Sequence, residues 1–308
     1  MRQISSRSRP RPSSAASKST PQAPKFGAHL SVAGGLHNAC TAATAVGCDC
    51  LQIFVKNQRQ WRAPKLNNEQ ISLFHAAAAQ AGVAPIVAHA SYLLNLAAPG
   101  GAIRSASIAA MIDELERCEA LGVSSLIFHP GAHLGEGLDV GIARIAAALD
   151  EVTRATAGFR TMILLEITAG QGTAIGFRFE QLAAIRAALA QPERTGVCLD
   201  TCHLFAAGYD FRTPAGYAGM MDELDSAIGL AHMRCIHVND SKKELGSRVD
   251  RHEHIGKGKI GRTGFANFVN DPRWAGMAMV LETPKGVDGR GTDLDKVNLK
   301  RLRGMVGS

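Results

Sequence analysis

The sequence has little that would suggest a secreted or membrane protein. No apolar stretch approaches the ~20 residues of a membrane span, and the seven cysteines are scattered without a CxxC pair. An odd number of scattered cysteines argues against a disulfide framework, so reduced thiols and a cytoplasmic location are expected. No coiled-coil pattern, second domain or short-period repeat is evident in the 308 residues. We therefore expect a monomer.

Familiar catalytic signatures are scarce as well. The glycines at 34–35 and 170–172 follow predicted strands, but these segments match neither the Walker A nor the dinucleotide-binding pattern. Tight turns explain these glycines equally well. No Ser-His-Asp arrangement is evident, so a side-chain nucleophile is not expected.

Residues 1–24 contain no acidic side chain, and their Arg and Lys supply five of the seven net positive charges. A basic DNA-binding face in the rest of the chain must therefore be local. The segment is rich in Ser, Pro and Arg without apolar periodicity, which predicts a disordered tail. A DNA-binding arm and an organelle-targeting segment are the alternatives. Four prolines would interrupt the amphipathic helix of a targeting signal.

From residue 25 to residue 308, short apolar runs alternate with helical stretches such as 102–121, 141–155 and 178–190. Eight strand-helix units predict an α/β domain, a single (β/α)8 TIM barrel. An open doubly wound sheet is the alternative, but it would gather its site at one switch point. The predicted strands lie near 25–30, 50–55, 85–88, 125–128, 162–166, 196–199, 234–238 and 278–282.

A histidine or a carboxylate closes one apolar run after another. Because the carboxyl ends of the strands of a parallel barrel meet at one mouth, these groups predict a metal site there. His203 follows Asp200 by three residues, and Asp250 and His252 are two apart, so each pair can face one site. His29 ends the first strand and is expected to orient a ligand. The candidate ligands are His89, His129, Glu166, Asp200, His203, His237, Asp250, His252 and Glu282.

Segments that contain these residues resemble the endonuclease IV family of apurinic/apyrimidinic DNA endonucleases. The resemblance covers about residues 25–303. One departure is Ile167, where related chains often have Asn, so a hydrogen bond beside the ligands is not expected here. The matching segments are 27–35 (GAHLSVAGG), 56–61 (KNQRQW), 89–96 (HASYLLNL), 128–131 (FHPG), 166–172 (EITAGQG), 200–203 (DTCH), 237–240 (HVND), 246–252 (GSRVDRH) and 281–283 (LET).

The resemblance implies three zinc ions, with manganese as an alternative at one position. The first would be held by His89, His129 and Glu166. Glu166 would bridge to a second, completed by Asp200, His237 and Glu282. The third would be held by His203, Asp250 and His252.

The resemblance also implies hydrolysis of the phosphodiester 5′ to an abasic site, leaving a 3′ hydroxyl and a 5′ deoxyribose phosphate. Removal of 3′ blocking groups is a further expected activity, and Glu166 is the expected catalytic residue. Zinc lowers the pKa of bound water to about 7, which supplies the hydroxide nucleophile. Arg59 and Tyr92 lie in segments that insert into DNA in the family, and Arg248 and Arg251 belong to a basic cluster expected to contact phosphates. The expected partner is damaged double-stranded DNA, and no membrane partner is expected. If the source is bacterial, the protein is expected at the nucleoid.

Two other functions stay open at this point. A sugar isomerase or epimerase uses the same kind of barrel, with one or two metals and a catalytic base. A non-catalytic binder of damaged DNA would keep the barrel but lose ligands, and none of the expected ligands is missing.

Overall fold

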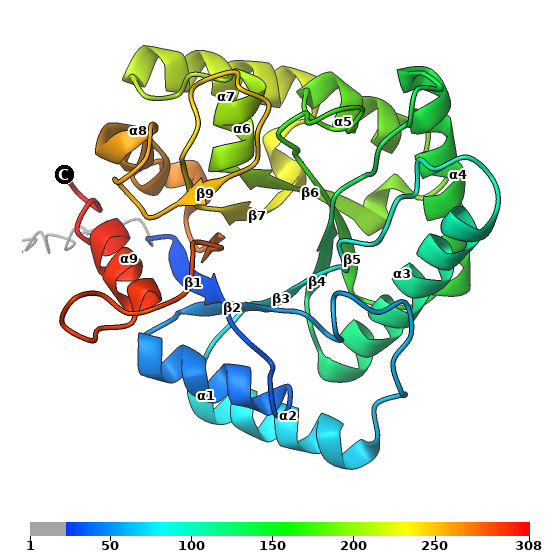
Figure 1. The fold of residues 1–308 in the computed structure, drawn as a ribbon, viewed down its shortest axis with the longest axis horizontal. Helices are drawn as coiled ribbons and strands as arrows, with labels where there is room; N and C mark the ends of the chain where they lie inside the picture. The colour runs from blue at the N-terminus through cyan, green and yellow to red at the C-terminus, as the bar shows by residue number, and fades with distance from the viewer. Residues whose placement is uncertain (1–22) are drawn as a thin grey trace, which may run out of the picture.

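The computed structural model describes residues 23–308. The predicted disordered tail therefore lies outside the described residues, except for Ala23 and Pro24. Eight strands form a closed barrel in which all neighbours are parallel, and the first strand pairs with the last (Figure 1). This confirms the predicted TIM barrel. The strands are β1 (Lys25–His29), β2 (Cys50–Ile53), β3 (Ile86–His89), β4 (Ser125–Phe128), β5 (Met162–Glu166), β6 (Thr195–Asp200), β7 (Met233–His237) and β10 (Ala278–Leu281).

Helices surround the barrel on all sides (Figure 1). The predicted stretch 102–121 is a helix over the same residues, whereas the stretch predicted at 178–190 ends earlier, and a 3-10 turn begins at Pro192, which cannot continue a helix. The helices are α1 (His37–Val46), α2 (Asn68–Ala81), α3 (Ala102–Leu121), α4 (Leu138–Ala155), α5 (Phe179–Ala187), α6 (Thr201–Ala207), α7 (Pro214–Ala227), α8 (Gly261–Val269) and α9 (Leu294–Arg303), with 3-10 turns at Pro192–Arg194, Leu230–His232 and Pro272–Trp274.

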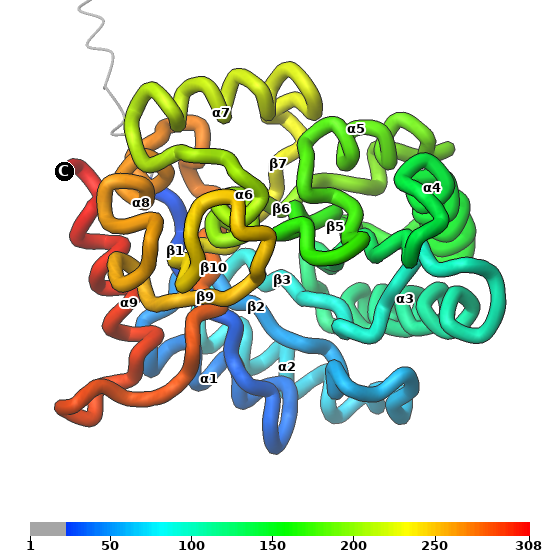
Figure 2. The backbone as a smooth tube through the Cα atoms, turned by 45° about the horizontal axis from the view of Figure 1, so that its top comes forward, coloured from blue at the N-terminus to red at the C-terminus, as the bar shows by residue number. Residues whose placement is uncertain are grey.

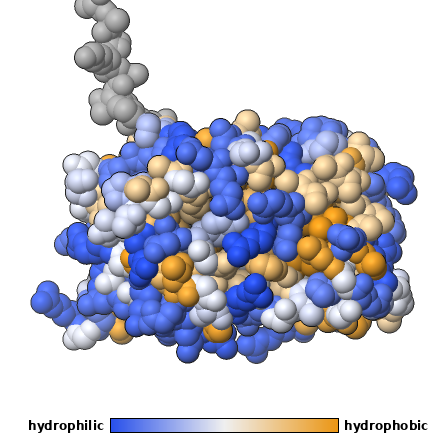
Figure 3. Space-filling model, turned by 90° about the horizontal axis from the view of Figure 1, so that it is seen from above, coloured by the Kyte–Doolittle hydropathy of each residue, from blue (hydrophilic) through white to orange (hydrophobic). Residues whose placement is uncertain are grey.

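The core lies in two places. The larger cluster of buried apolar side chains lies between the barrel and its helices, and a smaller cluster fills the barrel interior. The outer surface is largely hydrophilic on the face shown in Figure 3, with smaller hydrophobic groups between the polar ones. All seven cysteines lie within the described residues and are free thiols, as predicted.

A small antiparallel sheet stands over the barrel mouth. It pairs β8 (Asp240–Ser241) with β9 (His252–Glu253), and the chain between them runs as a loop across α6 (Figure 2). Asp240 is fully buried and accepts hydrogen bonds from the backbone N–H groups of Ser241, Gly258 and Ile260. This carboxylate therefore holds the loop that carries Asp250 and His252. No helix in residues 23–308 combines the length and apolar character needed to cross a membrane.

Candidate metal centre

The candidate site follows from the alternation of side chains along the barrel strands. Successive side chains of a strand point to opposite faces, so the residue two positions after an inward-facing one also faces inward. The inward positions deeper in the barrel carry apolar or thiol side chains, namely Cys50, Val87, Ile127, Leu164, Cys198, Cys235, Ala278 and Val280. On β1 the equivalent position is Gly27, where a Cβ would collide with the Cys50 carbonyl.

Two positions farther along, every strand or its following residue carries a polar side chain. We call these eight residues the ring. Most of the sequence-predicted ligands belong to it, and the strands alone bring them to one level of the barrel. The ring consists of His29, Gln52, His89, His129, Glu166, Asp200, His237 and Glu282.

Glu166 lies at the centre of the ring, and each of its oxygens faces different histidines. Oε2 is 3.0 Å from His89 Nε2 and 3.2 Å from His129 Nε2, whereas Oε1 is 2.9 Å from His237 Nδ1. Burial would raise the pKa of this carboxyl, but His237 and His129 hold that pKa well below its usual range. Glu166 is therefore a buried carboxylate placed to bridge two neighbouring positions.

Those two positions each offer a set of converging ligand atoms. The first is formed by His89, His129 and Glu166. The second combines Glu166 with Asp200, His237 and Glu282, and His237 Nδ1 lies 3.3 Å from Glu282 Oε2. Both groupings match the sets named from the sequence.

The third set lies where α6 and β9 approach the ring. Asp250 is 3.2 Å from both His203 Nε2 and His252 Nε2, through different carboxylate oxygens. Asp200 also lies close, because its Oδ2 is 3.7 Å from His252 Nε2. The structure thus groups Asp200 with His203, as their spacing suggested, and also with His252, which the sequence did not suggest.

The histidines present free nitrogen lone pairs to these sets. His89 donates its Nδ1–H to Ala90 O at 2.8 Å, His203 donates to Ile167 O at 2.8 Å, and His252 donates to Glu282 O at 3.2 Å. Such bonds fix the tautomer that leaves Nε2 unprotonated, and metal-binding histidines are commonly oriented in this way. Within the described chain, the buried Nε2 atoms of His203 and His252 have no hydrogen-bond partner, although both face Asp250. Imidazole nitrogens beside carboxylate oxygens form a donor set that suits zinc, so the residues present fit the metal.

Without a metal, protons would have to balance the carboxylates. Burial lowers the pKa of His252, but Asp200 and Asp250 outweigh burial and raise that pKa to about 9. His203 shifts in the same direction, since Asp200 and Asp250 raise its pKa well above the ordinary value despite burial. A divalent cation bound here would therefore compete with protons for the same nitrogen atoms.

Two amide side chains, which we did not predict as site residues, orient the ligands. Gln52 accepts a hydrogen bond from His237 Nε2 at 2.7 Å, and its Nε2 donates to Glu282 Oε1 and to His29 Nδ1. Asn239 donates to Asp200 Oδ2 at 2.7 Å and accepts from the Glu282 backbone N–H. The available signal for Gln52 was its position, two residues after the inward-facing Cys50. His29 lies beside one member of the second set, Glu282, with its Nδ1 3.6 Å from Oε1, and it also accepts a hydrogen bond from Gln52.

The residues predicted to contact DNA lie around the mouth and are exposed. Arg59 lies on the loop after β2, and Tyr92, which is 64% exposed, packs edge-on against Phe54 beside His89. Arg248 has a positive φ of 53° and lies with its guanidinium 4.9 Å from the centre of the Phe177 ring. Arg251 is exposed next to Asp250.

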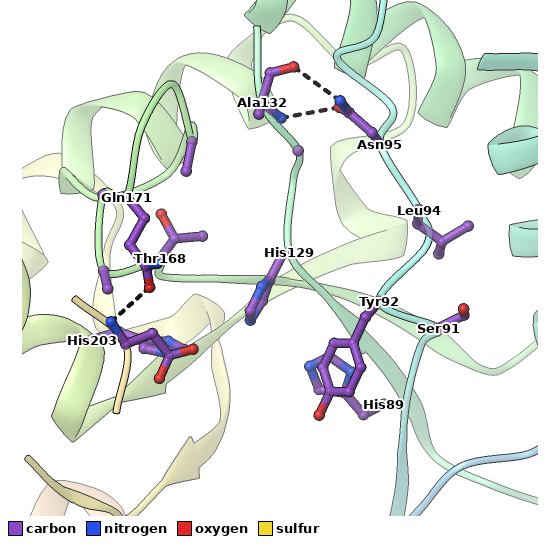
Figure 4. Close-up of a pocket in the computed structure, with 15 residues that line it drawn as sticks. His89, Ser91, Tyr92, Leu94, Asn95, His129, Ala132, Thr168, Gln171 and His203 are labelled. Atoms are coloured by element: carbon purple, nitrogen blue, oxygen red, sulfur yellow. Dashed lines mark hydrogen bonds and ion pairs between the residues drawn. The ribbon is translucent and has the colours of Figure 1, made fainter. Parts of the chain in front are cut away.

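A cavity of about 380 Å³ opens beside the ligands. His89, His129 and His203 face it from three sides, with Tyr92 at its edge (Figure 4). Asn95 braces one wall by exchanging two hydrogen bonds of 3.0 Å with the backbone of Ala132 (Figure 4). A small group entering this cavity from outside would therefore reach residues of the first and third ligand sets.

The chain is similar to known proteins in both sequence and fold. A family model described as a xylose isomerase-like TIM barrel matches residues 40–302. A relative from Chloroflexus aurantiacus named "Probable endonuclease 4" is 50% identical over 283 residues, which cover 92% of this chain and 98% of the relative. The solved endonuclease IV of Thermus thermophilus is 38% identical with a TM-score of 0.80, over 92% of this chain and 98% of that one. A solved D-tagatose 3-epimerase-like protein shares only the fold, at 18% identity and a TM-score of 0.69, over 91% of this chain and 96% of that one.

Proposed function

Since the chain belongs to the endonuclease IV family, we propose that it is a zinc-dependent DNA repair hydrolase that cleaves the phosphodiester 5′ to an abasic site. The products are a 3′ hydroxyl and a 5′ deoxyribose phosphate, and 3′-blocked ends are further substrates. The observation that best supports this proposal is the ring, in which Glu166 presents one oxygen to each of two ligand sets. We further propose that residues 25–308 form the catalytic domain of a cytoplasmic monomer that acts on chromosomal DNA.

The metal ligands are assigned by proximity. His89, His129 and Glu166 would hold the first zinc, and Glu166, Asp200, His237 and Glu282 would hold the second. His203, Asp250 and His252 would hold the third, and manganese is an alternative at one of the three positions. When bound, the ions neutralise the phosphate and lower the pKa of water so that hydroxide is available near pH 7.

The side chains of the ring hold the ligand groups in fixed positions. Glu166 cannot move without leaving both of its sets, because it is fully buried among four histidines. Gln52 and Asn239 restrain Glu282 and Asp200 from behind. Preorganised groups of this kind need little rearrangement in the transition state, which is how a hydrolase without a side-chain nucleophile can be fast.

Recognition of the lesion falls to the exposed residues. Arg59 and Tyr92 fill the gap in the base stack and hold the kinked duplex, and Arg248 and Arg251 contact backbone phosphates. An abasic nucleotide lacks one base, so it leaves the stack more cheaply than an intact one. The cavity beside His89 and His129 would receive it.

A sugar epimerase is the nearest competing function, because it shares the barrel at low sequence identity. The third ligand set and the exposed arginines favour the endonuclease. The deciding experiment is nicking of a duplex with one synthetic abasic site, with metal content measured on the same sample. Incision 5′ to the lesion by zinc-loaded protein supports the proposal. Turnover of a ketose without incision would overturn it.

A further inference from the structure

A charged cluster is buried beside the mouth of the barrel, apart from the ligand sets. The Lys56 side chain is 1% exposed, and its ammonium nitrogen lies 3.3 Å from Glu114 Oε1 and 3.1 Å from Asp113 Oδ2. Burial raises the pKa of Glu114 even beside this lysine. Apolar side chains of similar size would fill such a place at least as stably. The pair is therefore poorly explained by stability alone.

The contacts of this pair run to two loops at once. Lys56 donates a hydrogen bond to Trp61 O at 3.2 Å, which closes the loop 56–61 around Arg59. Glu114 accepts the backbone N–H of Ser91 at 3.1 Å, next to Tyr92. We call segments 56–61 and 91–96 the rim loops.

The rim loops are also joined to each other and to α3. The Ser91 hydroxyl donates to Gln58 O at 2.7 Å, directly beside Arg59. Arg117, one turn after Asp113 on α3, donates to Ala63 O and Pro64 O at 3.1 and 2.7 Å. One face of α3 thus anchors both rim loops below the exposed side chains.

We propose that Lys56 and Glu114 are positioning residues that fix Arg59 and Tyr92 relative to each other for a kinked, abasic duplex. This inference rests on the proposed function. Arg59 and Tyr92 are themselves exposed, so their geometry depends on the loops beneath them. Loops held in the bound conformation lose less entropy on binding, which strengthens the affinity for DNA. The chemistry in the ring does not use this pair.

The test compares variants that differ in how they break the pair. Lys56→Met alone leaves Glu114 as an unpaired buried carboxylate and risks unfolding. The double variant Lys56→Met/Glu114→Gln removes both charges and keeps the volume. Ser91→Ala removes only the hydroxyl contact between the rim loops. Lys25→Met is the matched control, because Lys25 donates to Ala84 O at the opposite end of the barrel.

Zinc-loaded protein is compared throughout. For the double variant we expect KM for an abasic duplex to rise about tenfold, while kcat stays within about twofold. Its metal content should not change. Combined with Arg59→Ala, the loss of affinity should be smaller than the product of the separate losses, because both changes remove one function. Ser91→Ala should shift KM in the same direction by less, and Lys25→Met should match the wild type. A fall in kcat at constant KM, or multiplicative losses with Arg59→Ala, would overturn the inference.

A second measurement separates this inference from the proposed function. Trp274 is 1% exposed, so acrylamide quenching of tryptophan reports mainly on Trp61 in the first rim loop. The double variant should be quenched more strongly than the wild type, and equal quenching would contradict the anchoring role. Wild-type protein that does not nick abasic DNA would overturn the proposed function, whatever the quenching shows.

Discussion

The ring and the rim loops lie next to each other and are built in opposite ways. Five of the eight ring side chains are buried, and ring members bond to one another across strands that are far apart in sequence. Arg59 and Tyr92 are exposed on loops that α3 anchors from below. The ring is fixed by the barrel itself, whereas the rim loops need dedicated contacts. Under the proposed function, catalysis by the ring and recognition of the substrate by the rim loops would therefore be separable.

The largest expected effect comes from the centre of the ring. Glu166→Ala removes the carboxylate shared by the first two ligand sets, so kcat should fall about a thousandfold or more. Metal content should fall as well, while part of the affinity for abasic DNA remains because the rim loops are intact. Steady-state nicking, metal analysis and a binding assay on one preparation check this. Glu166→Gln is the matched variant of equal size. Nicking that survives both changes would contradict the bridging role.

The next effect concerns how stability depends on pH. Stability should fall with rising pH in metal-free protein, whereas the stabilisation by bound metal should grow. In chelated protein, the raised pKa of His252, about 9 against an ordinary 6.5, adds stability that is complete below about pH 6.5 and is lost as pH rises through 9. The loss is bounded at about 3 kcal/mol. Metal needs the neutral imidazole, so the affinity for metal should increase over the same range. The gap in Tm between loaded and chelated protein should widen from pH 6.5 to 9. A constant gap would count against His252 as a ligand.

A smaller effect is expected behind the ring. Gln52→Leu keeps the approximate volume but removes the hydrogen bonds to His237 and Glu282, so metal affinity should weaken about 10- to 100-fold. Competition with a chromophoric chelator measures this, and excess zinc should restore most of the nicking. Gln60→Leu, on an exposed loop position, is the matched control. Unchanged metal affinity would mean that the strands alone orient His237.

Gln52 also illustrates how far the sequence could predict this site. Apolar runs that end in His, Asp or Glu predicted the barrel and six of the nine candidate ligands, because strand ends are visible in the sequence. The other three, His203, Asp250 and His252, were predicted from their spacing. Gln52 has the equivalent ring position on β2, but an amide is not a typical zinc ligand, so the sequence pattern did not predict it as a site residue. Asp200 near His252, and Lys56 near Glu114, depend on how loops and a helix fold over the mouth. Contacts of that kind leave no local periodicity. The metal binding of the nine residues stays a prediction.

The smallest expected effect lies on the rim. Arg59→Ala should weaken binding to an abasic duplex by about tenfold, because an exposed, partly solvated contact contributes less than a ring ligand. Metal content and kcat at saturating DNA should not change, since Arg59 contacts no ring residue. Fluorescence anisotropy with abasic and intact duplexes measures the difference. Arg62→Ala, an exposed arginine just beyond the same loop, is the matched control and should bind as the wild type does. If Arg59→Ala lowered metal content instead, the ring and the rim loops would not be separable, and the division of labour argued above would fail.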